Sequence, residues 1–176
     1  MNFTQFTEKL KEFDSGKIVF VGLGCETRGD DSAGLVFIHN LRKIKLFRNS
    51  VFIEAGRNPE NYLEKILNVK PQAVVFIDAG SWEGKPGEIK WLNPDEIKSI
   101  SISTHTFSIK MIEQFLSLNN QIIFLYLGIQ THSTESGKGL SNYIKDKFYG
   151  FFSEIYNLEQ TADNSSLPSS NTASCD

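Results

Sequence analysis

The stretch AVVFIDA, residues 73–79, is the most apolar strand-like segment of the sequence, and the fold class follows from it. A continuous apolar run without a polar face is typical of a parallel strand that is covered on both sides. Residues 18–23, IVFVGL, form a second run of this kind, which Gly24 closes, and residues 122–129 form a third. We therefore expect a sheet buried between two layers.

Apolar side chains recur at helical spacing in the segments that flank these strands. The patterns predict helices over residues 3–13, 32–43, 59–67 and 141–158, helices that begin near residues 94 and 106, and shorter strands over residues 51–54 and 88–92. Strands that alternate with helices indicate an α/β three-layer sandwich with a mainly parallel sheet. Residues 1–159 are expected to form this single α/β domain. Residues 160–176, rich in Thr, Asn, Ser and Pro, are expected to be a disordered tail.

The composition excludes several kinds of site. The 176 residues make about one domain, and they include only three histidines and two cysteines. These counts rule out a four-thiolate zinc site, an all-cysteine iron–sulfur cluster and a disulfide framework. Eighteen basic against 21 acidic side chains give a net charge of −3, and no run of Lys or Arg is present to neutralise a phosphate backbone. Nucleic acid is therefore not an expected partner.

The sequence also bears on the compartment. The first 17 residues are charged and their apolar residues are spaced, which is unlike a secretory signal. No apolar run approaches the roughly 20 residues of a membrane helix, so no membrane insertion is expected. Cys25 and Cys175 lie far apart in the chain, which fits a reducing compartment, and we expect a cytoplasmic protein.

The first glycine loop invites comparison with a dinucleotide fingerprint. The glycines of residues 22–29 do not have the G-x-G-x-x-G spacing, and Glu54 lies well beyond the roughly 20 residues at which a ribose-binding acid follows. Asp30 and Asp31 would also meet a pyrophosphate with two carboxylates at a helix N-terminus, where amide donors are needed. These departures argue against a nucleotide site.

Three side chains that suit a divalent metal lie at strand exits or helix starts. Asp31 stands beside Asp30 in the first loop, Asp78 ends the most apolar strand, and His105 precedes a helix. Each has a simpler role: one of the two adjacent Asp residues can cap the helix while the other faces outward, Asp78 can form an Asx turn, and a lone His is usually structural. Together, at one edge of a parallel sheet, two carboxylates and an imidazole suit nickel or zinc with positions left for substrate or water. They indicate a possible hydrolytic site.

Four other residues near this edge are secondary candidates. No motif ties Cys25 to a histidine, so we expect a small apolar side chain packed in a tight loop and not a nucleophile. His39 is expected to face solvent, His132 to lie close enough to line the cleft, and Glu54 to support the site from the sheet edge. The sequence has no H-E-x-x-H, G-x-S-x-G or P-loop motif.

Six short motifs follow one another in a recognisable order. They are GLGCETRGDDSAG at residues 22–34, IEAG at 53–56 with PEN at 59–61, FIDA at 76–79, PGEI at 86–89, STH at 103–105 and LGIQ at 127–130. This set resembles the nickel-iron hydrogenase maturation endopeptidases, most closely those of the hydrogenase 3, formate-hydrogenlyase type, and the resemblance runs from about residue 17 to residue 158. The chain departs from the usual family pattern at Cys25, Ser32, residues 54–55 and Thr131, where the family usually has Asn, Gly, Asp-Gly and Pro.

The resemblance implies a phosphorylase/hydrolase-like α/β/α sandwich with a twisted, mostly parallel sheet of about five strands. It implies an endopeptidase that clips the C-terminal extension from the precursor of the hydrogenase large subunit once nickel has been inserted. Asp31, Asp78 and His105 match the residues that contact the metal, and Asp31 or Asp78 would act as general base in an aspartate-type, nickel-dependent hydrolase. The nickel is expected to arrive with the precursor, since three protein ligands without thiolates give modest affinity at rest.

Two alternatives from other classes stay open. A non-catalytic nickel-sensing or chaperone-like module would bind the immature large subunit without cutting it, and it would co-purify with a precursor that loses no mass. A nucleotide-binding enzyme that uses the first glycine loop would instead gain thermal stability from NAD or ATP.

Overall fold

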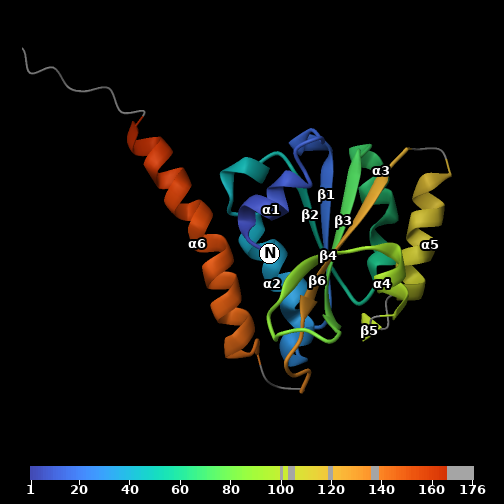
Figure 1. Cartoon of the computed structure of the whole chain (residues 1–176). Coiled ribbons are helices and arrows are strands. Elements are labelled where there is room, and N and C mark those ends of the chain that lie inside the picture. Colours follow the sequence, from blue (N-terminus) through green and yellow to red (C-terminus); the bar gives the residue numbers. More distant parts are fainter. Residues whose placement is uncertain (100, 103–105, 119–120, 136–138, 166–176) are drawn as a thin grey trace, which may run out of the picture.

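A computed structural model of the chain describes residues 1–99, 101–102, 106–118, 121–135 and 139–165 (Figure 1). The strands are β1 (Ile18–Leu23), β2 (Val51–Gly56), β3 (Ala73–Ser81), β4 (Ile89–Leu92), β5 (Ser101–Ile102) and β6 (Ile123–Gln130). The helices are α1 (Phe3–Glu8), α2 (Ala33–Leu41), α3 (Leu63–Val69), α4 (Pro94–Ser99), α5 (Thr106–Ser117) and α6 (Asn142–Ser165). Short 3-10 turns are η1 (Ser15–Lys17), η2 (Gly29–Ser32), η3 (Lys45–Phe47) and η4 (Pro59–Tyr62).

One sheet forms the middle layer, with the strand order β2-β1-β3-β6-β4. β2, β1, β3 and β6 are parallel, whereas β4 runs antiparallel to β6 and the two-residue β5 runs antiparallel to the end of β3. The predicted mostly parallel sheet of about five strands is confirmed, with β5 as a short addition. β2 and β3 lie on opposite sides of β1, so the order of connections reverses between β1 and β3.

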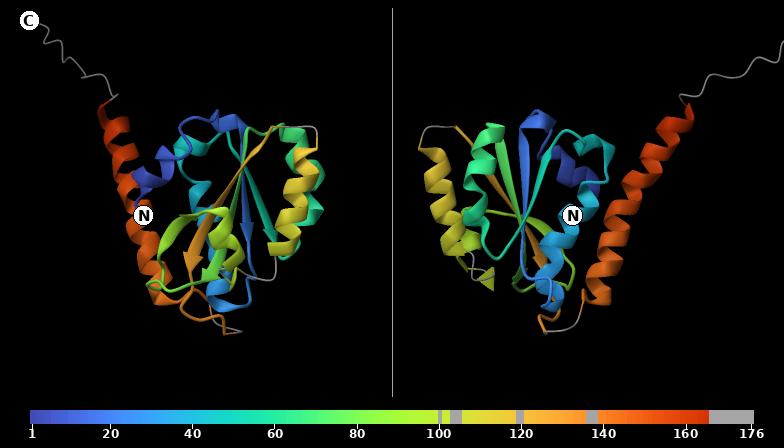
Figure 2. Two further views of the ribbon diagram at one scale, coloured as in Figure 1. Left: turned by 45° about the vertical axis from the view of Figure 1, so that its right-hand side comes forward. Right: turned by 180° about the vertical axis from the view of Figure 1, so that it is seen from behind.

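Helices cover both faces of the sheet, which confirms the three-layer sandwich (Figures 1 and 2). α1, α2 and α6 pack on one face, where Phe6 and Phe37 share an apolar cluster with Phe20 of β1. α3 and α5 cover the other face, where Ile112 lies in a second cluster with Val21 of β1. Consecutive residues of β1 alternate between the two clusters, because neighbouring side chains of a strand point to opposite faces. All six residues of β1 are therefore buried.

The last helix is longer than the sequence indicated. α6 runs through Ser165, so residues 160–165 are helical where a disordered tail was expected, and residues 166–176 lie outside the described part. No Gly or Pro interrupts residues 151–165, so nothing stops a helix whose first half is already docked on α1 and α2. Its far end extends past the rest of the molecule (Figure 2). Within the described residues, no helix combines the length and apolar character needed to cross a membrane.

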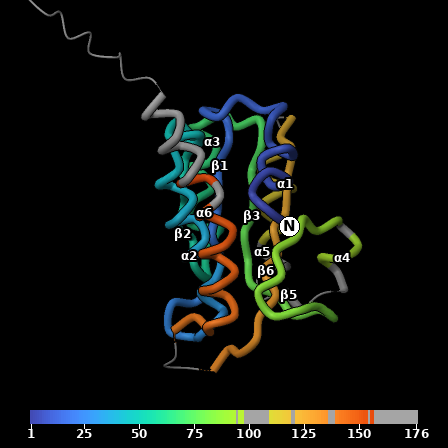
Figure 3. The backbone as a smooth tube through the Cα atoms, turned by 60° about the vertical axis from the view of Figure 1, so that its left-hand side comes forward, coloured from blue at the N-terminus to red at the C-terminus, as the bar shows by residue number. Residues whose placement is uncertain are grey.

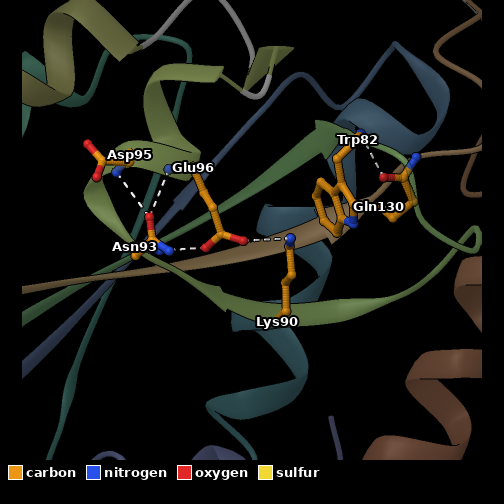
Figure 4. Close-up of polar contacts among 6 residues, drawn as sticks. All are labelled: Trp82, Lys90, Asn93, Asp95, Glu96 and Gln130. Atoms are coloured by element: carbon orange, nitrogen blue, oxygen red, sulfur yellow. Dashed lines mark hydrogen bonds and ion pairs between the residues drawn. The ribbon is translucent and has the colours of Figure 1, made fainter.

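The predicted start of α4 is confirmed. The Asn93 Oδ1 accepts hydrogen bonds from the backbone N–H groups of Asp95 at 3.0 Å and Glu96 at 2.9 Å (Figure 4). The Glu96 Oε2 in turn accepts the Asn93 N–H at 2.9 Å, which completes a capping box. Glu96 also binds the Lys90 Nζ at 2.9 Å, and that ammonium lies 4.9 Å from the ring centroid of Trp82. The helix is thus tied to β4 and to the loop after β3.

Gly34 decides how closely α2 sits on the sheet. A Cβ at this position would collide with the carbonyl oxygen of Ile77 and would lie 2.6 Å from that of Leu23. Both are backbone atoms, which move only if the strands move. The first turn of α2 therefore rests directly on β1 and β3. Its contact on β3 is Ile77, the residue immediately before Asp78.

Replacement of Gly34 by Ala should lower the free energy of unfolding by about 1–3 kcal/mol, because the methyl group forces α2 away from the two strands. Urea denaturation measures the loss. Gly150→Ala is the matched control, since Gly150 is exposed in α6 and its Cβ would meet nothing within 4 Å. That change should raise stability by about 0.5–1 kcal/mol through helix propensity. A gain at both positions would contradict the close approach at Gly34.

Candidate active site

The proposed metal ligands were predicted to lie at the edge of the sheet that the carboxyl ends of β1 and β3 form. In open parallel sheets, ligands bind in the crevice between two neighbouring strands whose connections leave on opposite faces. β1 continues into α2 on one face, whereas the chain after β3 passes through β4, α4 and β5 to α5 on the other. Asp31 follows β1, and Asp78 lies in β3. Two of the three predicted ligands therefore flank the crevice position of this topology.

Asp31 lies in η2, the turn between β1 and α2, and its backbone is fixed on both sides. Its N–H donates to the carbonyl of Arg28 at 3.0 Å, and its own carbonyl accepts the N–H of Cys25 at 3.2 Å. Gly24 has a φ of +122°, and a Cβ there would overlap the Asp31 carbonyl, so only glycine fits. The side chain of Asp31 is partly exposed, and η2 lies in contact with β3.

Asp78 does not end its strand, which corrects the sequence-based prediction. β3 continues to Ser81, because Asp78 pairs with Gly128 of β6 and Gly80 pairs with β5. Pairing with β1, however, stops at Ile77, so Asp78 is the first residue of β3 beyond the end of that pairing. Its side chain is 5% exposed, and Oδ1 accepts the N–H of Ala79 at 2.8 Å. An Asx turn at the strand exit is therefore not its role.

His105 lies outside the described residues. In the sequence it falls between β5, which pairs with the end of β3, and the first residue of α5. Among the described residues, no three His, Cys, Asp or Glu side chains are grouped so that they could hold a metal ion. The set of Asp31, Asp78 and His105 as metal ligands thus stays a prediction.

Asp30 has a role that the sequence did not reveal. Its carboxylate is fully buried, and Oδ2 accepts the N–H groups of His132 at 2.8 Å and Ser133 at 2.9 Å, while Oδ1 accepts that of Ser141 at 2.7 Å. Its own N–H donates to the carbonyl of Ser133 at 2.9 Å. These partners belong to the connection between β6 and α6, which passes the first turn of α2 (Figure 3). The expected helix cap is wrong, since neither η2 nor α2 has a side-chain cap.

The three N–H groups hold Asp30 in its charged form. Burial alone raises the pKa of this carboxyl group, but the hydrogen bonds from Ser141, Ser133 and His132 outweigh it and keep the pKa of Asp30 below its ordinary value. A carboxyl group whose pKa is lower in the folded state stabilises the fold above its unfolded pKa of about 3.9. That stabilisation is lost as the pH falls through the folded-state pKa.

Asp30→Asn should lower the free energy of unfolding at pH 7 by about 2–4 kcal/mol, because an amide cannot accept N–H groups on both sides of the side chain. The difference from the wild type should stay constant between about pH 7 and 5 and shrink below about pH 4, where the carboxyl group of Asp30 is protonated in the unfolded chain. Urea denaturation of both proteins across this range measures it. A difference as large at pH 3 as at pH 7 would show that the charge is not what stabilises the turn.

Gln130 fixes the loop after β3 at the same edge. It is 6% exposed at the end of β6, and its Oε1 accepts the N–H of Trp82 at 2.9 Å (Figure 4). The backbone of Gln130 also accepts the N–H of Gly87 and donates to the carbonyl of Glu88, both at 2.8 Å. Residues 82–88 are therefore held against β6. The sequence signal was a polar residue at the end of an apolar strand, but its partner could not be predicted.

Cys25 is partly exposed and not packed away as expected. Its Sγ lies 3.4 Å from the Thr27 Oγ1. Hydrogen bonds to the side chain and backbone of Thr27 lower the pKa of the Cys25 thiol below its ordinary value. No described contact connects this thiol with a histidine, so a base for nucleophilic chemistry is missing among the described residues.

The other secondary candidates lie at the surface, and His39 and Glu54 line one pocket together with Glu26 and Ser32. His39 is exposed on α2, as predicted. His132 is also exposed, and its ring packs 4.6 Å from that of Tyr143 between centroids. Glu54 pairs with Arg42 at 3.1 Å. Glu54 lies opposite Gly22, near the carboxyl end of β2 and so at the same edge of the sheet as η2, and its support of the site stays a prediction.

Comparison with known proteins decides the family. Residues 36–157 match the model of the HycI family, described as hydrogenase maturation proteases. The chain belongs to this family. A putative hydrogenase maturation protease from Methanocaldococcus jannaschii is 33% identical over 132 residues, which cover 70% of this chain and 76% of the relative. The hydrogenase 3 maturation protease of Escherichia coli K12 is 31% identical over 114 residues, 64% of this chain and 71% of the relative.

Solved structures share the fold. The crystal structure of the [NiFe] hydrogenase maturation protease HycI from Thermococcus kodakarensis matches with a TM-score of 0.67 and 26% identity over 82% of this chain and 93% of that one. The predicted family and enzyme class are confirmed: this hydrogenase maturation protease is a hydrolase. The family match begins within α2, so Asp78 and His105 lie inside it and the turn with Asp30 and Asp31 precedes it.

Proposed function

We propose that this hydrogenase maturation protease removes the C-terminal extension of a hydrogenase large-subunit precursor after nickel has been inserted. Family membership supports a proteolytic step in hydrogenase maturation. The observation that carries the assignment of the site is the position of Asp31 and Asp78, which flank the crevice where β1 and β3 part. We place the reaction in the cytoplasm, because two cysteines far apart in the chain fit a reducing compartment.

The nickel belongs to the substrate in this proposal. Asp31, Asp78 and His105 engage the ion that the precursor already holds through its own ligands. Two carboxylates and one imidazole bind a borderline metal while leaving positions for a peptide carbonyl or water. Three such ligands have only modest affinity for free nickel, so cleavage depends on nickel that is delivered with the precursor. The protease thereby acts only after nickel insertion is complete.

The two aspartates differ in exposure, which bears on their roles in an aspartate-type, nickel-dependent cleavage. Asp31, Asp78 and His105 would hold the precursor's nickel, which would supply Lewis acidity toward the scissile carbonyl or a bound water, and one aspartate would accept the proton of the attacking water as general base. Asp31 is the more accessible of the two, whereas Asp78 is nearly enclosed. Both assignments of the general base are compatible with this difference.

The test uses purified protein with nickel-loaded and nickel-free precursor, and mass spectrometry follows the C-terminal fragment. Only the nickel-loaded precursor should be cut. Asp31→Asn, Asp78→Asn and His105→Ala should each lower kcat/KM by about 10²–10⁴-fold, the range for loss of an acid–base group.

His39→Ala is the matched control, because His39 is exposed on α2 and should leave the rate unchanged. Normal cleavage by Asp78→Asn and His105→Ala would overturn the site. Equal cleavage of both precursors would overturn the dependence on nickel. A precursor that co-purifies with the protein and never loses mass would favour the non-catalytic binding module.

A further inference from the structure

We propose that Asp30 is a positioning residue that sets the spacing of Asp31 and Asp78 across the crevice. It acts through the connection between β6 and α6. The effect on catalysis rests on the proposed function. The connection between the two aspartates rests on hydrogen bonds among the described residues. Three sets of contacts connect Asp31 with Asp78 along the backbone.

The first set of contacts holds Asp30 itself. Four hydrogen bonds join it to one segment: three N–H groups donate to its carboxylate, and its own N–H donates to the carbonyl of Ser133. The carboxylate is 0% exposed, so water does not compete for it. A charged acceptor with every oxygen bonded has one favourable position, and the peptide bond to Asp31 transmits that position directly.

The second set of contacts holds the turn around Asp31. Gly29 has a φ of +52°, and a Cβ there would lie 3.0 Å from the carbonyl oxygen of Ser133 and 3.2 Å from that of Glu135. On its other side, η2 is bonded to the loop directly after β1, because the Cys25 N–H donates to the Asp31 carbonyl at 3.2 Å. η2 is therefore enclosed between β1 and the connection after β6. Asp31 cannot shift without breaking one of these contacts.

The third set of contacts reaches the strand of Asp78. Thr131 begins the connection that Asp30 holds, and its N–H donates to the carbonyl of Gly80 at 2.9 Å. Gly80 lies two residues after Asp78 in the same strand. A continuous path of backbone and hydrogen bonds thus runs from Asp31 through Asp30 and the connection to β3. The path bridges the two walls of the crevice.

The expected consequence is a loss of turnover more than of binding. Functional side chains must be held within about 0.5 Å of their productive geometry, and a displacement of about 1 Å can cost about 10²-fold in rate. Asp30→Asn leaves both proposed ligands in the chain but loosens the path between them. We expect kcat to fall about 10–100-fold with KM changed less than about twofold.

The control for a general loss of stability is Ile44→Ala. Ile44 is 0% exposed and lies after α2, at the opposite end of that helix from η2. Both variants are compared at a temperature at which circular dichroism shows them folded. Ile44→Ala should keep the wild-type kcat. A normal kcat in Asp30→Asn, or an equal loss in Ile44→Ala, would overturn the proposal. If Asp30→Asn does not fold, Ser141→Pro removes one of the three donors and takes its place.

A second measurement does not depend on cleavage. Backbone NMR shifts of Asp31 and Gly80 should both change in Asp30→Asn and stay unchanged in Ile44→Ala. Changes confined to His132, Ser133 and Ser141 would overturn the proposal even if the rate fell. If the wild type cuts no precursor while the shifts of Asp31 and Gly80 move together, the proposed function fails and the link across the crevice stands.

Discussion

The absence of a side chain at Gly34 is the constraint on which the rest of the structure depends. It lets the first turn of α2 rest on the carbonyl oxygens of Leu23 and Ile77. Gly22 faces this contact from β1, where a Cβ would lie 2.9 Å from the Gly34 carbonyl. α2, the helix that follows β1, therefore packs against β3 as well as β1. Without this approach, the turn that carries Asp31 would not lie beside the strand that carries Asp78.

Aromatic packing in the outer layer supports the same edge from a distance. Phe37 of α2 lies between 5.1 and 5.4 Å from the ring centroids of Phe148, Phe151 and Phe152 of α6. These contacts dock the first half of α6 against α2. Docking fixes where α6 begins, and Ser141, the residue before it, supplies one of the N–H groups that bind Asp30. The packing of the apolar core therefore helps to place a hydrogen-bond donor of the buried Asp30 carboxylate.

The sequence predicted what depends on neighbours along the chain and missed what depends on distant segments. The apolar runs gave β1 and β3 and the layer order, and the capping residues at Asn93 gave the start of α4. A two-residue strand such as β5 leaves no periodic pattern to detect. A helix cap was expected from either Asp30 or Asp31, and the actual role of Asp30 was missed because its partners lie 102 to 111 residues further along the chain, where no local pattern connects them. The extent of β3 past Asp78 was missed because its pairing there comes from β6 and β5.

The distance in sequence between Asp30 and its partners also dictates an order of assembly. The half of the chain that contains β1, α2, β2 and β3 holds both Asp31 and Asp78, yet the hydrogen-bond partners of Asp30 described above are absent until residues 132–141 exist. During synthesis, domains form from the amino terminus, and contacts of large sequence separation are completed late. The crevice therefore acquires its final shape only after β6 and the first turn of α6 have left the ribosome. A nascent chain of this protease therefore contains Asp31 and Asp78 long before the turn between β1 and α2 has its final contacts.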